Sequence, residues 1–156
     1  MRFFLIDRIT EINPGSTAKG LKAWSLDNEI FQDHFPGFPT VPGVLLTESM
    51  AQLSGILIEK SYYQEYGDKN PVYPVLSIIQ KAKFRSFVRP GDQCIIESQL
   101  LSIDRGRANV EVKTFLNKEK VVDAQLSFVI GMTSDMDENP YLKRREQYYH
   151  SILPKS

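Results

Sequence analysis

The sequence predicts an α+β fold: a single domain in which an antiparallel sheet of about six strands covers one long helix. Three observations lead to this prediction. Only the segment from Val44 to about Tyr66 is long enough, and free enough of proline and glycine, to form a substantial helix. Six other segments have strand-like patterns, mostly separated by short turn-forming sequences. The chain has 156 residues, of which 42% are hydrophobic, and this is enough for one globular domain with a real core.

The first two strands are predicted to form an antiparallel pair. Phe3 to Ile12 is apolar and rich in β-branched residues, and the sequence Asn13-Pro14-Gly15-Ser16 interrupts it as a turn would. Thr17 to Leu26 then alternates imperfectly between apolar and polar residues. These features predict two strands joined by a tight turn.

A segment rich in proline and glycine connects this pair of strands to the long helix. Pro36, Pro39 and Pro42 recur at every third position, which favours a rigid, extended backbone because proline fixes φ. The segment contains His34, one of only two histidines in the chain. Gly43 stands where the helix is expected to begin, so free backbone N–H groups there could bind a developing oxyanion.

The long helix is predicted to be buried on most of its faces. One stripe holds its core-facing residues, Leu46, Met50, Leu53 and Leu57. The opposite stripe holds Glu48, Gln52, Gly55 and Glu59, and aliphatic residues flank it on both sides. The simplest interpretation is that Glu48 points into water, as most glutamates do. The apolar flanks favour a second interpretation, in which Glu48 and Gln52 lie in a narrow polar seam.

The remaining strands follow the helix. They are predicted over Tyr73–Phe87, Gln93–Ile103, Ala108–Phe115 and Val121–Ile130. Beyond residue 132 the sequence becomes polar and charged, so we expect a domain over residues 1–132 and a C-terminal extension over residues 133–156, with a short helix from Pro140 to about His150.

Composition argues against several classes of function. Lysine and arginine total 19 and so do aspartate and glutamate, so the chain offers no overall basic field for nucleic acid. No segment approaches the ~18 uninterrupted apolar residues of a membrane span. Asp7 and Arg8 interrupt the apolar N-terminus where a secretory signal would continue. The single cysteine, Cys94, lies in a strand-like segment and is expected to be a core thiol. We therefore expect a cytoplasmic protein.

The stretch HFPGFPTVPGVLLTESMAQ resembles the signature of the β-hydroxyacyl-acyl-carrier-protein dehydratases of fatty acid synthesis. In that family a histidine opens an H-F-P-x-x-P-x-x-P-G loop, and an acidic residue follows fourteen positions later in the central helix. The matching residues here are His34, Phe35, Pro36, Pro39, Pro42, Gly43 and Glu48. FFLIDRITEI and KFRSFVRPGD resemble two further family segments, so the resemblance extends over approximately residues 2–130.

This resemblance implies a hotdog fold, in which a curved sheet wraps one long helix. It also implies dimers that pair through their sheets, with the active site in a tunnel at the dimer interface. The histidine and the acid would come from different subunits. The homodimer could stand alone or form part of a trimer of dimers.

The implied activity is dehydration of 3-hydroxyacyl-acyl-carrier-protein to trans-2-enoyl-acyl-carrier-protein, in a fatty acid or related lipid or polyene pathway. His34 would remove the α-proton, and Glu48 would protonate the departing hydroxyl. The N–H of Gly43 would bind the thioester oxygen, Gln52 would orient Glu48, and Phe38 would line the substrate site. Phe38 stands where many relatives have a second histidine, and PVLSIIQ lacks the glycine usual before the later motif.

No metal or other cofactor is expected, because the two histidines are far apart in the sequence and Cys94 has no nearby companion. The expected partner is an acidic acyl carrier protein. Its candidate contacts are Lys81, Lys83, Arg85, Arg89, Arg105 and Arg107. Two alternatives stay open: a hotdog thioesterase, in which Glu48 activates water and His34 is idle, and a noncatalytic acyl-binding subunit.

Overall fold

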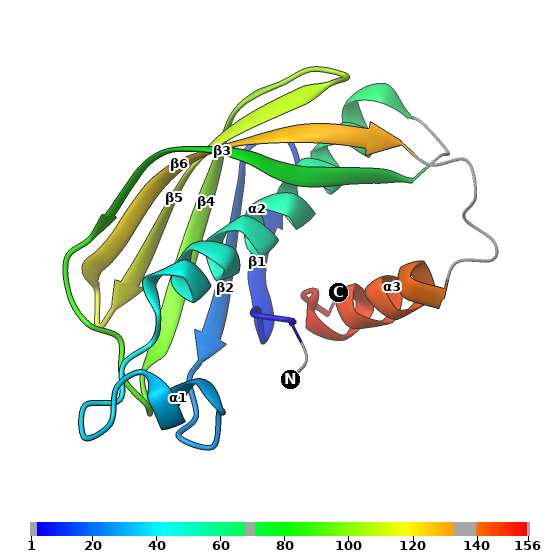
Figure 1. Cartoon of the computed structure of the whole chain (residues 1–156). Coiled ribbons are helices and arrows are strands. Elements are labelled where there is room, and N and C mark those ends of the chain that lie inside the picture. Colours follow the sequence, from blue (N-terminus) through cyan, green and yellow to red (C-terminus); the bar gives the residue numbers. More distant parts are fainter. Residues whose placement is uncertain (1–2, 68–70, 133–139, 156) are drawn as a thin grey trace.

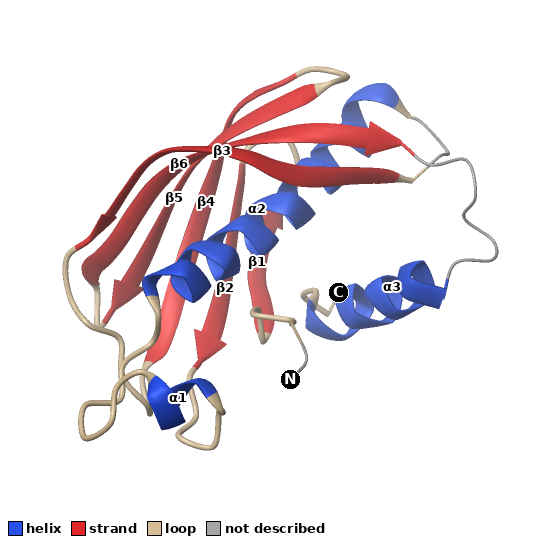
Figure 2. Ribbon diagram, viewed as in Figure 1, coloured by secondary structure: helices blue, strands red, loops and turns tan. Residues whose placement is uncertain are grey.

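The computed structural model describes residues 3–67, 71–132 and 140–155. Within these ranges, six antiparallel strands form one curved sheet in the order β1-β2-β4-β5-β6-β3, and α2 lies in its concave face (Figures 1 and 2). The strands are β1 (Arg8–Asn13), β2 (Thr17–Ala23), β3 (Val72–Phe84), β4 (Gln93–Ile103), β5 (Arg107–Leu116) and β6 (Glu119–Met132). The helices are α1 (Ile30–Asp33), α2 (Gly43–Tyr66) and α3 (Pro140–Ile152). This arrangement confirms the expected hotdog fold.

The central helix α2 is buried on most of its faces, as the sequence predicts. Its predicted core residues are all buried: Leu46, Met50, Leu53 and Leu57. Ile56 and Ile58, outside that stripe, are buried as well. The helix ends at Tyr66. The next residue, Gly67, has a left-handed φ of 61° that suits glycine, and its N–H donates to the Tyr63 carbonyl at 3.0 Å.

The N-terminal strand is shorter than predicted, because β1 begins at Arg8 and not at Phe3. The backbone N–H groups of Leu5 and Ile6 bond to side chains of α2 and α3. Both residues are nevertheless buried. The apolar pattern therefore correctly indicated buried residues. Their backbone N–H groups, however, donate hydrogen bonds to side chains of two helices and not to a neighbouring strand.

Two other predicted strands also end earlier than expected. β2 ends at Ala23, because the N–H and carbonyl of Trp24 bond to the backbone of Asp92 and Gly91. β3 ends at Phe84, and the carbonyl of Val88 beyond it accepts the N–H of Val41 at 2.8 Å. The segments that follow β2 and β3 therefore form backbone hydrogen bonds that hold the loops near α1.

Helix α1 was not predicted from the sequence. It spans only four residues, Ile30–Asp33, which is too short to show a helical hydrophobic period. Phe31 is buried and anchors it to the core. His34 directly follows the helix, so α1 sets the position from which the proline-rich loop begins.

Strand β3 forms an edge of the sheet, because among the described strands it pairs only with β6. Four of its hydrophobic residues are between 46% and 58% exposed: Val75, Ile78, Ile79 and Phe84. We call these four residues the β3 edge patch. An exposed apolar edge of this kind commonly marks an interaction surface.

Cys94 is a buried free thiol in β4, which confirms the expected core position. Burial raises the pKa of this thiol to about 12, so it stays protonated at neutral pH. The predicted C-terminal helix is also present, as α3. The proposed domain boundary adjoins residues 133–139, which lie outside the described residues, and it stays a prediction. No helix in the described ranges is long and apolar enough to cross a membrane.

Candidate active site

The imidazole of His34 is held in one tautomer by the loop that follows it. Its Nδ1 lies 2.8 Å from the carbonyl oxygen of Thr40. A carbonyl can only accept a hydrogen bond, so Nδ1 carries the proton and donates it. The lone pair of neutral His34 therefore resides on Nε2, where it can accept a proton from another molecule.

The loop around His34 is fixed by its own backbone hydrogen bonds. The N–H of Thr40 donates to the His34 carbonyl at 2.9 Å, which closes the loop. Phe35 and Phe38 exchange backbone hydrogen bonds of 3.0 and 2.9 Å, around a turn in which Gly37 has a φ of 75°. The His34 ring also stacks on Phe35, with ring centroids 4.0 Å apart. These contacts restrain the direction in which the imidazole points.

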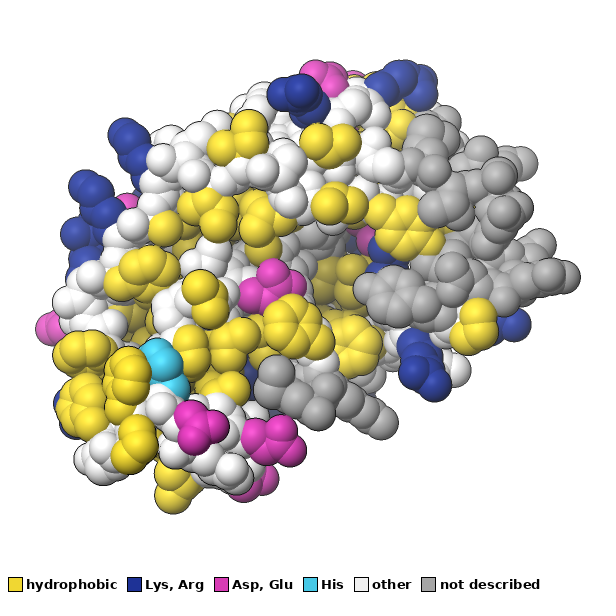
Figure 3. Space-filling view, in the orientation of Figure 1, with side chains coloured by type: hydrophobic (Ala, Val, Ile, Leu, Met, Phe, Trp, Pro, Cys, Tyr) yellow, Lys and Arg dark blue, Asp and Glu magenta, His cyan; other side chains and the backbone are white. Residues whose placement is uncertain are grey.

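Apolar side chains surround this end of the molecule. Figure 3 shows hydrophobic side chains gathered where α1 and the following loop lie in Figure 1. Phe38 packs edge-on against Phe87 at 5.3 Å, and the guanidinium of Arg89 lies 4.6 Å from the Phe38 ring centroid. Phe38 thus belongs to an exposed aromatic cluster with a cation above it.

Gly43 begins α2, and no side chain caps this helix terminus. The first N–H groups of a helix have no partner within the helix, so they can bind a ligand atom. A Cβ atom at Gly43 would come within 3.1 to 3.3 Å of three carbon atoms of the Phe84 ring. The close approach of Phe84 therefore explains why glycine occupies this position.

Glu48 lies in the second turn of α2 and is half-buried in the polar seam. Its Oε1 accepts a hydrogen bond from Gln52 Nε2 at 3.0 Å. The same nitrogen donates to the Phe3 carbonyl at 3.0 Å, and Gln52 Oε1 accepts the N–H of Leu5 at 2.8 Å. These two backbone bonds fix the orientation of the amide, so Gln52 presents a donor to Glu48. Among the described residues, no hydrogen bond to the second oxygen of Glu48, Oε2, accompanies this one.

His34 and Glu48 are not paired within one chain. Each has its own hydrogen-bond partner in the described part of the structure, and these two side chains share neither a hydrogen bond nor an ion pair. A reaction that uses both groups therefore needs a substrate between them or a second copy of the chain.

The six basic residues predicted to contact a carrier protein fall into two groups. Lys81, Lys83, Arg85 and Arg89 lie along the last part of β3 and just beyond it, toward the end where Phe84 meets Gly43. Arg105 lies at the opposite end of α2, because its guanidinium is 4.6 Å from the ring centroid of Tyr66, the last helical residue. Arg107 begins β5 beside it. Only the first group lies near the His34 loop.

Sequence reasoning missed several residues that support the site. Thr40 and Val88 act through backbone carbonyls, so their side-chain types gave no signal. Phe84 was recognisable only as part of a strand. Tyr148, whose hydroxyl bonds to the backbone of Ile6, comes from α3, for which the sequence suggested no role.

The sequence of the chain is similar to a known family model and to known proteins over most of its length. The chain matches the model of the FabA-like domain over residues 1–125. It is 38% identical over 128 residues to the 3-hydroxyacyl-[acyl-carrier-protein] dehydratase FabZ of Caldicellulosiruptor saccharolyticus, covering 82% of this chain and 88% of that protein. It is 39% identical over 127 residues to the FabZ of Clostridium acetobutylicum, covering 81% of this chain and 86% of that protein.

Solved structures show the same fold at much lower identity. The dehydratase heterocomplex ApeI:P from Xenorhabdus doucetiae has a TM-score of 0.66 at 15% identity, covering 93% of this chain and 90% of that one. A hypothetical thioesterase protein with coenzyme A from Streptococcus pneumoniae TIGR4 has a TM-score of 0.63 at 12% identity, covering 81% and 86%. His34, Gly43, Glu48 and Gln52 all lie within the residues that match the family model, whereas α3 lies beyond them.

Proposed function

Because the chain belongs to the FabA-like family, and its relatives named above are 3-hydroxyacyl-[acyl-carrier-protein] dehydratases, we propose that it removes water from 3-hydroxyacyl thioesters of acyl carrier protein. In this proposal His34 is the base and Glu48 is the acid. The hydrogen bond from His34 Nδ1 to the Thr40 carbonyl is the main structural support, because it leaves Nε2 free to accept a proton.

The proposed reaction begins at the α-carbon of the substrate. Nε2 of His34 takes the α-proton, and the electron pair of that C–H bond moves toward the thioester carbonyl. Negative charge builds on the thioester oxygen, where the N–H of Gly43 donates a hydrogen bond. Removing one such donor from an enzyme typically costs ~3 to 4 kcal/mol of barrier.

The second half of the reaction expels the hydroxyl group. The electron pair returns to form the double bond, the C–O bond at the β-carbon breaks, and Glu48 Oε2 supplies the proton that makes the departing group water. Gln52 donates to Oε1, so it orients the carboxyl group without competing for the oxygen that carries the proton. The two groups regain their starting protonation states by exchange with water.

A direct assay tests the activity and separates it from the thioesterase alternative. The protein is incubated with 3-hydroxyacyl and trans-2-enoyl thioesters of acyl carrier protein, and hydration, dehydration and free thiol are measured together. We expect interconversion of the two thioesters without release of thiol. Release of thiol without any enoyl product would instead identify a thioesterase, and no turnover at all would favour a noncatalytic acyl-binding subunit.

We also propose that the chain forms a homodimer through β3, with each active site shared between subunits. Pairing two β3 edges would cover the β3 edge patch, which otherwise exposes apolar side chains on an edge strand. It would also allow His34 of one subunit to approach Glu48 of the other. The lack of a direct bond between these side chains within one chain supports a shared site.

The dimer can be tested with a charge in the β3 edge patch. We expect Ile79→Glu to produce a folded monomer without dehydratase activity. Dimer formation would bury the new carboxylate and remove its hydration shell, which costs free energy. Leu101→Glu is the matched control, since Leu101 is 52% exposed on β4 and Ile79 is 50% exposed on β3. Light scattering, circular dichroism and the hydration assay give the three readouts. A dimeric Ile79→Glu protein would contradict the proposed interface, and an active monomer would contradict the shared site.

We further propose that the acyl carrier protein docks on the basic residues at the end of β3. Arg85 is already paired with Asp123, so Arg89, above Phe38, is the better target for mutation. A cytoplasmic location, where Cys94 would stay reduced, suits such a soluble partner.

The docking proposal predicts a defect specific to the carrier protein. We expect Arg89→Glu to raise the KM for the carrier-bound substrate about tenfold, because a rim charge mainly affects association with an acidic partner. The KM for the same acyl group on a short pantetheine analogue should stay unchanged. Arg105→Glu, at the opposite end of α2, is the matched control and should leave both constants unchanged. Equal KM values of the wild-type and Arg89→Glu proteins for carrier-bound substrate would exclude docking at this site.

A further inference from the structure

We propose that the C-terminal helix α3 positions Glu48 through the N-terminal segment, residues 3–7, and that Tyr148 is the positioning residue. This inference rests on the proposed role of Glu48 as the catalytic acid. The helix lies outside the residues that match the family model, so the inference concerns a feature that the match does not describe.

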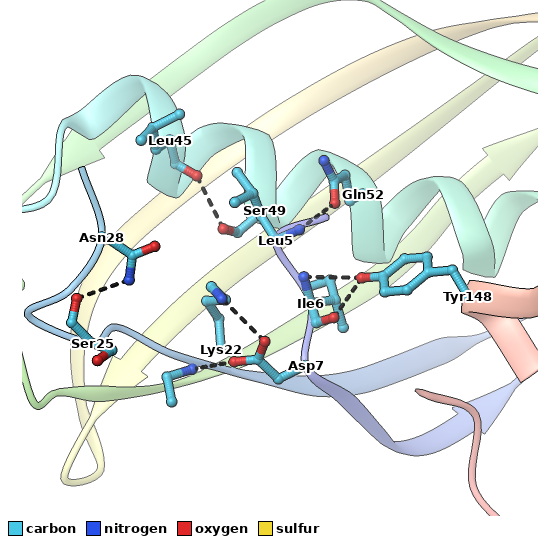
Figure 4. Close-up of polar contacts among 11 residues, drawn as sticks. Leu5, Ile6, Asp7, Lys22, Ser25, Asn28, Leu45, Ser49, Gln52 and Tyr148 are labelled. Carbon is cyan, nitrogen blue, oxygen red and sulfur yellow. Dashed lines mark hydrogen bonds and ion pairs between the residues drawn. The ribbon is translucent and has the colours of Figure 1, made fainter. Parts of the chain in front are cut away.

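The first link joins α3 to the N-terminal segment. The Tyr148 hydroxyl donates to the Ile6 carbonyl and accepts the Ile6 N–H at 3.2 Å (Figure 4). The Tyr148 ring also stacks on Phe4, with centroids 4.1 Å apart and planes inclined by 20°. One side chain of α3 therefore contacts two residues of the segment, Phe4 and Ile6, on either side of Leu5.

The protonation state of Tyr148 suits this double role. Burial raises the pKa of its hydroxyl to about 12, although the hydrogen bond to Ile6 opposes that change. The hydroxyl therefore keeps its proton, and with it the ability to donate, at any pH where the enzyme is expected to work.

The second link joins the segment to Glu48. The N–H of Leu5, the residue next to Ile6, donates to Gln52 Oε1 at 2.8 Å, as Figure 4 also shows. The amide of Gln52 in turn donates to Glu48 Oε1. Since Leu5 and Ile6 share a peptide bond, a shift of the Ile6 backbone also moves the group that orients Gln52. The chain of contacts thus runs from Tyr148 to Ile6 and Leu5, then through Gln52 to Glu48.

The segment depends on these contacts because it lacks regular strand pairing. β1 starts only at Arg8, and the described backbone contact of the segment with the sheet is the bond from the Asp7 N–H to the Leu21 carbonyl. Phe3 and Leu5 bond to Gln52 instead. Without Tyr148, the backbone groups of Ile6 would lose their hydrogen-bond partner, and the packing of its buried side chain and the bonds of its neighbours would be left to hold it.

A buried ion pair connects helix α3 to α2. Arg145 forms an ion pair with Glu59 at 3.2 Å, and both side chains are only 10% exposed. The Arg145 guanidinium also lies 4.5 Å from the ring centroid of Tyr73. Burial raises the pKa of Glu59, and the charge of Arg145 opposes that change. Two buried charged groups that must meet leave α3 few alternative positions.

The N-terminal segment and α3 contact the same stripe of α2. Glu48, Gln52 and Glu59 share the polar stripe, and the N-terminal segment contacts Gln52 while α3 contacts Glu59. In Figure 1, α3 lies beside β1 and the N-terminal end of the chain. The N-terminal segment and α3 thus contact the polar seam at two places, and Tyr148 joins them to each other.

The test uses Tyr148→Phe, which keeps the ring and removes only the hydroxyl. We expect kcat for hydration of an enoyl thioester to fall about tenfold with little change in KM, because a small displacement of the acid slows the chemical step. Gln147→Ala, an exposed change on the same helix, is the control and should leave kcat and KM unchanged.

A double-mutant cycle distinguishes positioning from a general loss of stability. If Tyr148 acts through Gln52, Tyr148→Phe should lower kcat in the wild-type background but cause no further loss in a Gln52→Ala background. Thermal unfolding of each variant verifies that the fold is retained. An unchanged kcat in Tyr148→Phe, or the same tenfold loss in both backgrounds, would overturn the inference. If Glu48→Gln itself left turnover unchanged, the proposed role of Glu48 as the acid would fail instead.

Discussion

Replacing His34 with alanine is expected to lower kcat for hydration of an enoyl thioester by about 10² to 10⁴-fold, the range typical of a general base. The reason is the fixed tautomer: the Thr40 carbonyl holds the proton on Nδ1, so Nε2 is the only imidazole atom that can accept one. Alanine removes this acceptor but leaves the loop bonded through the His34 backbone, which accepts the Thr40 N–H. The variant should therefore stay folded and dimeric.

His150→Ala provides a matched control, because His150 is the other histidine of the chain and is exposed on α3. It should keep wild-type turnover. Near wild-type turnover in a folded His34→Ala protein would refute the assignment of the base. If both histidine variants lost activity equally, the effect would have to be attributed to something other than the Nε2 acceptor.

Glu48→Gln should cause a loss of kcat of similar size, about 10² to 10⁴-fold, because an amide cannot give a proton to the departing hydroxyl. The amide oxygen can still accept the hydrogen bond from Gln52, so the polar seam keeps its packing. The measurement is again turnover of the enoyl thioester, with circular dichroism to monitor the fold. A folded Glu48→Gln protein with normal turnover would show that Glu48 is not the acid.

Mixing the two inactive proteins tests whether the site is shared between subunits. If His34 of one subunit works with Glu48 of the other, a heterodimer of His34→Ala and Glu48→Gln chains contains one intact site and one site lacking both groups. Random exchange of subunits makes about half of the dimers mixed, so about one quarter of wild-type activity should return. No recovery after verified exchange would place both groups of each site in the same subunit.

Much of the fold was predictable because its local patterns are strong. The long helix has no competing interpretation: it is the one long stretch with few helix breakers, and its observed start at Gly43 lies one residue before the predicted start. The strands β4, β5 and β6 were placed to within a few residues by their alternation and turn sequences. Helix α1 was missed because a single turn of helix has no periodicity to detect.

The candidate site was only partly accessible to sequence reasoning. The spacing of His34, Gly43 and Glu48 predicted the reacting groups, since those residues match a specific family motif. The division of the basic residues into two groups was not accessible, because Arg89 and Arg105 lie at opposite ends of α2 through sheet pairing and not through sequence distance.

By itself, the sequence determined the elements and the chemistry that they carry: a buried helix, a sheet around it, and a histidine, a glycine and a glutamate at fixed spacing. Those properties depend on residue types and short-range order. Only the tertiary structure decided that a carbonyl of the loop fixes the His34 tautomer, and that Tyr148 meets Ile6 beside Gln52. The Tyr148 contact joins residues 142 positions apart, which no local pattern can encode. The His34 contact is local, but it uses a backbone carbonyl that any residue type at position 40 would supply, so residue types do not reveal it.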